Sequence, residues 1–173
     1  MLKSFTQAAA DYCAAAKNRT RQSVPRLLIL GILAGMVIAL AGTAASVGGA
    51  LAGKIASAAI FPAGLAMVIL AGSELFTGNC LFLLPLLRGD ITGGRTMGSW
   101  AVVYCGNLIG SIVIAFVVVR CGVLDSIAPA AIATAAAKAS LPFGAAFLRG
   151  VLCNLLVCLA VWMAFAQGPP GAK

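Results

Sequence analysis

Long runs with almost no charged residues dominate the chain. They cover residues 27–53, 55–87, 96–119 and 141–166, where Glu74 alone interrupts the second run and Arg149 alone the last. Each run reaches or exceeds the ~20 residues that a helix needs to cross a bilayer. The pattern therefore predicts an all-α membrane protein with a single domain over residues 1–173 and four membrane spans. The alanine-rich segment 127–137 is too short to span, and we expect an external loop with a helical part there.

The N-terminal segment, residues 1–25, has a different pattern. Phe5, Ala9, Tyr12 and Ala16 recur at helical spacing, with polar residues between them. This spacing predicts a short amphipathic helix on the inner membrane surface. A frayed tail is the alternative at this point.

Composition agrees with a membrane protein and sets its orientation. The chain is 62% hydrophobic and 9% charged, with a mean hydropathy of +1.07. A soluble domain of this size could not bury so much apolar surface. Lysine and arginine flank the spans unequally, and the positive-inside rule then predicts a multi-pass plasma-membrane protein with both termini in the cytoplasm. Eight basic residues fall on the N-terminal side, including the tail residue Lys173, against Lys54, Arg120 and Lys138 on the other.

The same residue counts argue against several classes of protein. The net charge is +8, but the basic residues flank the spans and form no nucleic-acid patch. There is no histidine, and the six cysteines include no CxxC pair, so we expect neither a metal nor a cofactor. No nucleophile–base pair is present either, and we expect no enzymatic activity.

The run 55–87 is too long for one straight helix. It would measure roughly 50 Å, against about 30 Å of hydrocarbon. Gly72, Gly78 and Asn79 permit non-helical backbone, and Thr77 can cap a new helix. We therefore predict a helix broken near 72–79, whose second half directs its N-terminal N–H groups at an anion site.

Glu74 is the only charged residue between Lys54 and Arg88. A carboxylate in the middle of a bilayer costs about 2.5–3.5 kcal/mol. Two interpretations are open. In the favoured one, Glu74 is structural and accepts hydrogen bonds from backbone N–H groups freed by the break. In the other, it lines the path or exchanges protons.

Glycines recur at four-residue spacing in three pairs. They are Gly31/Gly35, Gly49/Gly53 and Gly106/Gly110. Such pairs allow two helices to approach closely, within one subunit or between subunits.

Three stretches together resemble the formate/nitrite transporter family. They are "AGSELFTGN" with the basic loop after it, "WAVVYCGNLIGS", and residues 138–166. The resemblance covers residues 26–166. It implies an aquaporin-like fold of six transmembrane helices in two inverted repeats, assembled as a homopentamer with one pore per subunit. It also implies transport of small monovalent anions, with formate or nitrite first and hydrosulfide, lactate or acetate open.

The resemblance also implies roles for particular residues. Thr77 matches the threonine of the mid-membrane loop, with Leu75 and Phe76 as its apolar neighbours. Phe61 and Leu65 match the hydrophobic constriction. Two further matches are Lys138 at the mouth and Asn154 deep in the pore. For each there is an ordinary alternative: a loop lysine, apolar packing, a helix cap, or an asparagine that binds unwound backbone.

The chain departs from the family pattern at its end. Family members continue into a second broken helix with a central histidine and then a sixth helix, whereas this sequence ends in "QGPPGAK" with four of six helices. We expect a fragment or a truncated or frame-shifted gene product, and we expect residues 1–173 alone not to conduct with family-like selectivity. Two functions follow: a channel or transporter for small monovalent anions in a bacterial inner membrane, or a non-transporting structural partner of full-length subunits.

Overall fold

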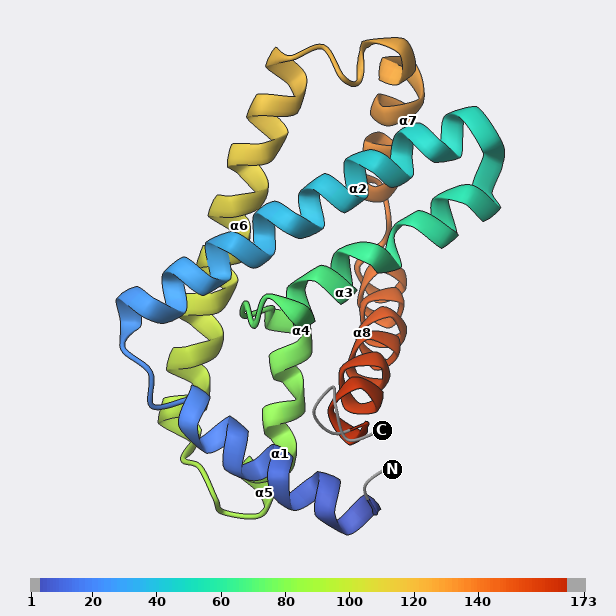
Figure 1. Cartoon of the computed structure of the whole chain (residues 1–173). Helices are drawn as coiled ribbons and strands as arrows, with labels where there is room; N and C mark the ends of the chain where they lie inside the picture. Colours follow the sequence, from blue (N-terminus) through green and yellow to red (C-terminus); the bar gives the residue numbers. More distant parts are fainter. Residues whose placement is uncertain (1–3, 168–173) are drawn as a thin grey trace.

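A computed structural model of the chain describes residues 4–167, and every regular element in that part is a helix. Residues 1–3 of the N-terminal segment and the tail 168–173, with the Lys173 of the charge count, lie outside the described residues. Figure 1 shows α1 and α5 at one end of the molecule, and the loop after α6 with α7 at the other.

The first helix, α1 (Phe5–Arg19), begins with a capping box in which the Ser4 hydroxyl accepts the N–H of Gln7 at 3.3 Å. Its apolar face buries Tyr12 and Ala16 against a cluster that includes Phe82 from η1. The predicted N-terminal helix is thus present rather than frayed, and its apolar face packs against protein.

The second helix, α2 (Val24–Ile60), contains the first sharp reversal of the chain. Gly53 has φ 84° and ψ 178°, a conformation that glycine adopts without strain. The chain then runs back along α2 and continues as α3 (Pro62–Leu70) (Figure 1). The boundary between the first two apolar runs therefore coincides with this turn.

Helices α2 and α6 (Gly93–Arg120) make the most extensive contact in the fold. Gly31 and Gly35 face Gly106 and Gly110, so that a Cβ added at Gly106 would lie 3.0 Å from the Gly31 Cα. Two of the predicted glycine pairs therefore meet each other within the chain. The third pair, Gly49/Gly53, lies at the chain reversal in α2 instead. A Cβ added at Gly49 would lie 3.0 Å from the Ser57 Cβ of the returning helix.

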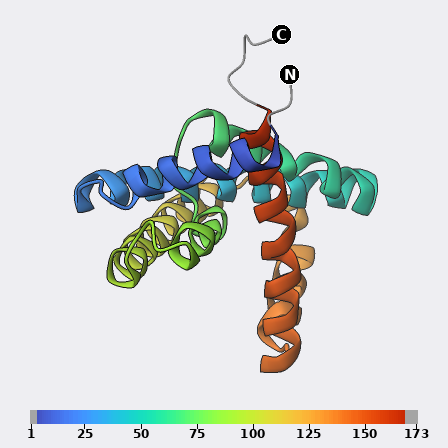
Figure 2. The ribbon, with the colours of Figure 1, turned by 90° about the horizontal axis from the view of Figure 1, so that it is seen from below.

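After α3 the chain breaks and resumes as α4 (Phe76–Asn79), η1 (Cys80–Phe82) and α5 (Leu83–Leu87). After α6 come η2 (Asp125–Ile127), α7 (Ala128–Ala139) and α8 (Phe143–Ala166). The helix α7 agrees with the helical part expected in the external loop. Figure 2 shows α8 extending away from the other helices, and none of its residues is buried.

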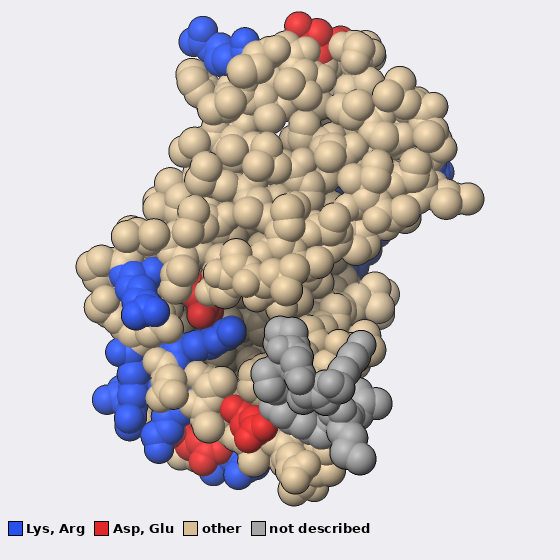
Figure 3. All heavy atoms as spheres, viewed as in Figure 1, with Lys and Arg blue, Asp and Glu red and all other residues tan. Residues whose placement is uncertain are grey.

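Three helical stretches of the described chain are long and apolar enough to cross a membrane: Val24–Leu70, Gly93–Arg120 and Phe143–Ala166. Because Val24–Leu70 doubles back at Gly53, it supplies the first predicted span and the first half of the second. The shorter apolar stretch Phe76–Leu87 supplies the other half. Figure 3 shows basic side chains concentrated at the end that holds α1, below a broad surface with few charged residues. The four span boundaries remain predictions.

Candidate functional site

The break in the second run lies between α3 and α4. Helix α3 ends at Leu70, Gly72 takes a left-handed φ of 64°, and α4 begins at Phe76. The predicted interruption of the helix is confirmed. It occupies residues 71–75, slightly earlier than its predicted limits.

Asn107 of α6 holds the break in place. Its Oδ1 accepts the Phe76 N–H at 2.9 Å, and its Nδ2 donates to the Gly31 and Glu74 carbonyls at 2.8 and 3.0 Å. The Glu74 N–H donates to the Leu30 carbonyl of α2 at 3.2 Å. Helices α2 and α6 therefore satisfy backbone groups that the break leaves without helical partners. Our sequence reasoning missed Asn107, although an amide next to Gly106 in an apolar helix was a usable signal.

The Glu74 carboxylate is buried, at 1% exposure, and binds side chains rather than backbone. It accepts a hydrogen bond from the Asn79 amide at 2.8 Å and lies 3.6 Å from the Arg19 guanidinium of α1. The predicted bonds from freed backbone N–H groups are thus wrong, because the helices on either side already supply those partners. The burial and the two partners agree with the structural interpretation of Glu74.

Three further details of the predicted break are corrected. The residue that caps α4 is Leu75, with no side-chain hydrogen bond, and Thr77 lies inside the helix. Gly78 and Asn79 are also helical and buried. Only Gly72 of the three proposed break residues has non-helical backbone. Asn79 instead bridges two elements, since its carbonyl accepts the Trp100 indole N–H at 2.9 Å.

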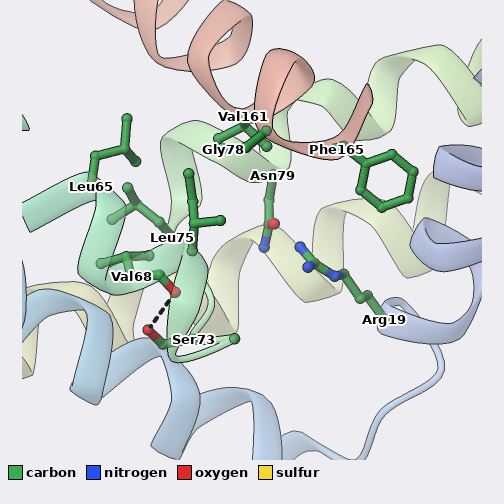
Figure 4. Close-up of a pocket in the computed structure, with 12 residues that line it drawn as sticks. Arg19, Leu65, Val68, Ser73, Leu75, Gly78, Asn79, Val161 and Phe165 are labelled. Carbon is green, nitrogen blue, oxygen red and sulfur yellow. Dashed lines mark hydrogen bonds between the residues drawn. The ribbon is translucent and has the colours of Figure 1, made fainter. Parts of the chain in front are cut away.

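An inner cavity of about 210 Å³ lies beside the break. Its walls include Leu65 of α3, Leu75, and Gly78 and Asn79 of α4, together with Arg19 of α1. Figure 4 shows the Arg19 guanidinium directed toward Asn79, with Phe165 of α8 on the same side as Arg19 and Val161 of α8 beside Gly78. Most of the lining is apolar, and Arg19 is its one cationic side chain among the described residues. Sequence reasoning did not single out Arg19.

An outer cavity of about 610 Å³ lies between the α2 reversal and α7. Lys138 and Phe61 line it, together with Lys54, Ser57 and Thr134. Phe61 thus borders the outer cavity, and Leu65, one helical turn later, borders the inner one. Each of the two predicted constriction residues therefore borders one of the two cavities.

Three predicted pore residues line neither of these cavities. The Phe76 ring packs against Tyr104 and Trp100 of α6, with centroids 5.4 and 6.3 Å away. The Thr77 carbonyl accepts the Cys158 thiol of α8 at 3.5 Å. Asn154 is half-buried in α8, and its Oδ1 has no hydrogen-bond partner among the described residues.

Comparison with known proteins agrees with this geometry. Residues 6–173 match the sequence model of a family described as "Formate/nitrite transporter". The chain belongs to the formate/nitrite transporter family. A probable formate transporter of Methanothermobacter thermautotrophicus is 36% identical over 95% of this chain and 70% of its own length. The nitrite transporter NirC of Salmonella typhimurium is 40% identical over 61% of this chain and 40% of its own length.

The solved structure of an "FNT family ion channel" extends the family likeness to three dimensions. It matches with a TM-score of 0.82 at 30% identity, over 95% of this chain and 70% of that one. The formate/nitrite transporter fold is therefore the fold of this membrane protein, with the second helix broken as expected. The chain spans 70% of the length of the Methanothermobacter relative, 64% of the uncharacterized Bacillus subtilis transporter YrhG, and less of several others.

Proposed function

We propose that this chain contributes to a path for small monovalent anions across a membrane, with formate and nitrite as the substrates. The observation that carries the proposal is a pair of cavities, one bordered by Phe61 and the other by Leu65, which lie one helical turn apart. Cationic side chains stand on both sides, Lys138 outside and Arg19 inside. A positive field attracts anions, and an apolar constriction rejects hydrated cations.

Further parts of the proposal follow the family and the charge pattern. The chain works as a channel or transporter without enzymatic chemistry, in a bacterial inner membrane with its N-terminus in the cytoplasm. Arg19, Arg88 and Arg95 belong to the end that holds α1, as the positive-inside rule requires for a cytoplasmic face. Assembly as a homopentamer belongs to the same proposal, and hydrosulfide, lactate and acetate are further candidate substrates.

One observation favours a second function. Helix α8 has no buried residue, and the Asn154 Oδ1 in it lacks a partner within the described chain. Unsatisfied polar groups in lipid cost several kcal/mol each. A chain that served as a structural partner of longer subunits would cover this helix with protein without transporting anions itself.

Transport by the purified chain in liposomes tests both functions. Saturable formate and nitrite influx, faster than chloride influx, supports the channel, whereas insertion without influx supports the structural partner.

In an active preparation, Lys138→Ala should lower the influx, and more strongly at low ionic strength, because a mouth charge acts over ~10 Å at 0.1 M salt. Arg120→Ala is the matched control, since Arg120 lies at the same end, over the Phe116 ring. An equal response of both variants at every salt concentration would reduce Lys138 to an ordinary loop residue.

A further inference from the structure

The outer cavity has a second lysine, Lys54, which the sequence analysis counted only as a basic residue flanking the spans. Lys54 follows Gly53 directly, so the left-handed turn at Gly53 fixes where the returning helix begins. Lys54, Ser57 and Phe61 line the cavity at a spacing of three and four residues. They therefore form one face of the returning helix.

The opposite wall is built in the same way. Ala131, Thr134 and Lys138 of α7 line the cavity, again at a spacing of three and four residues. Lys54 and Lys138 also line an adjoining cavity of about 500 Å³, so each borders both spaces. Two helix faces that are remote in the sequence thus bring one lysine each to a shared space.

The two lysines have no negative counterpart in the described structure. No aspartate or glutamate lines the outer cavity or the adjoining cavity. Neither lysine ammonium pairs with a carboxylate within residues 4–167. Like charges that converge on one space repel each other, and an anion between them removes that repulsion. Both side chains are exposed, so an anion in solution reaches them without prior desolvation.

Most of the hydroxyl groups that line the outer cavity already donate a hydrogen bond within their own helix, so few other donors remain for an anion. The hydroxyls of Ser46 and Thr134 both donate to carbonyls of their own helices at 2.8 Å. The Thr43 hydroxyl does the same at 2.9 Å. The Ser57 hydroxyl donates to no acceptor within the described residues. An anion in this cavity is therefore met by two ammonium groups and one hydroxyl.

We propose that Lys54 and Lys138 hold one small monovalent anion between them in the outer cavity, with the Ser57 hydroxyl as a third donor. This inference rests on the proposed function, in which the same cavity is the outer entrance of the path. It adds Lys54 as a residue that concentrates the substrate ahead of the constriction. Because ammonium groups are point charges, this site selects for negative charge and small size rather than for a particular anion.

Site-resolved acetylation of lysines tests the shared site without relying on transport. The neutral lysine amine is the nucleophile that attacks an acylating reagent, and a bound anion favours the unreactive ammonium form. Saturating formate, compared with gluconate at equal ionic strength, should slow acetylation of Lys54 and Lys138 in the detergent-solubilised chain by about twofold or more. Lys17 of α1, at the other end of the molecule, should react at an unchanged rate. Equal rates in formate and gluconate at Lys54 would overturn the proposal.

The Lys138→Gln variant tests whether the two lysines share one anion. Protection of Lys54 by formate should fall by more than half in Lys138→Gln and persist in the matched control Arg120→Gln, because only the first removes a partner of the anion. Full protection of Lys54 in Lys138→Gln would mean separate sites and refute the shared one.

Transport kinetics separate this inference from the proposed function. In an active preparation, Lys54→Gln should raise the half-saturating formate concentration ~3- to 10-fold at low salt, with a smaller change in maximal rate, and Lys54→Arg should restore it. Protection without any influx would refute the proposed function and leave the anion site standing. Influx without protection of Lys54 would refute the anion site alone.

Discussion

Replacing Asn107 by alanine removes the side chain that fastens the broken helix. Asn107 makes three hydrogen bonds, to the Phe76 N–H and to the carbonyls of Gly31 and Glu74. The loss at the partly buried Phe76 is the costly one, because an N–H left without a partner away from water costs about 1–3 kcal/mol. Bonds between membrane helices average ~0.6 kcal/mol, and two of them add about 1 kcal/mol. We therefore expect Asn107→Ala to destabilise the fold by about 2–4 kcal/mol.

Unfolding in mixed micelles, followed by helix content and tryptophan fluorescence, measures this loss. Trp100 reports on the break directly, because its indole N–H donates to the Asn79 carbonyl. Ser111→Ala is the matched control one turn further along α6. Its hydroxyl donates to the Asn107 and Gly35 carbonyls, and its loss should cost under ~1 kcal/mol.

Hydrogen exchange at the Phe76 amide gives a local test of the same reasoning. Asn107→Ala should accelerate exchange there, whereas Asn107→Asp keeps an acceptor for this N–H and loses only the two donated bonds. Exchange at Phe76 should therefore rise less in Asn107→Asp. A stability of Asn107→Ala within ~0.5 kcal/mol of the unmodified chain, with Phe76 still protected, would refute the role given to Asn107.

Two other predictions concern packing and pH. Gly106→Val should destabilise the fold by more than ~2 kcal/mol in the same unfolding assay, because even a Cβ there would lie 2.8 Å from the Leu28 carbonyl oxygen. Gly98→Val, where a Cβ meets nothing within 4 Å, is the control, and equal losses would contradict the close helix contact. Burial raises the pKa of the Tyr12 phenol above its usual value. The neutral phenol stabilises the fold fully below the unfolded-state pKa of about 10. This stabilisation is lost as the pH rises through the folded-state pKa. Stability should therefore fall more steeply above pH ~10 in the unmodified chain than in Tyr12→Phe, and parallel curves would contradict this.

The order of residues along the chain was enough to predict the class of protein and most of its helices. Charge-free runs of sufficient length have few alternatives in a bilayer, because only helices or closed barrels satisfy their own backbone there. The excess length of residues 55–87, with Gly72 inside it, also sufficed to predict a broken helix. The pairs Gly31/Gly35 and Gly106/Gly110 predicted close packing, but the spacing alone could not say that they pack against each other.

The contacts that hold the break together depend on how the helices pack in three dimensions. Asn107 reaches the break because the glycines bring α2 and α6 close together, and Arg19 reaches Glu74 because α1 folds back over η1 and α5. Lys54 and Lys138 share a cavity because Gly53 reverses the chain opposite α7. Each of these contacts joins residues that are remote in the sequence, and local spacing cannot encode which remote side chain will satisfy a freed backbone group or a buried charge.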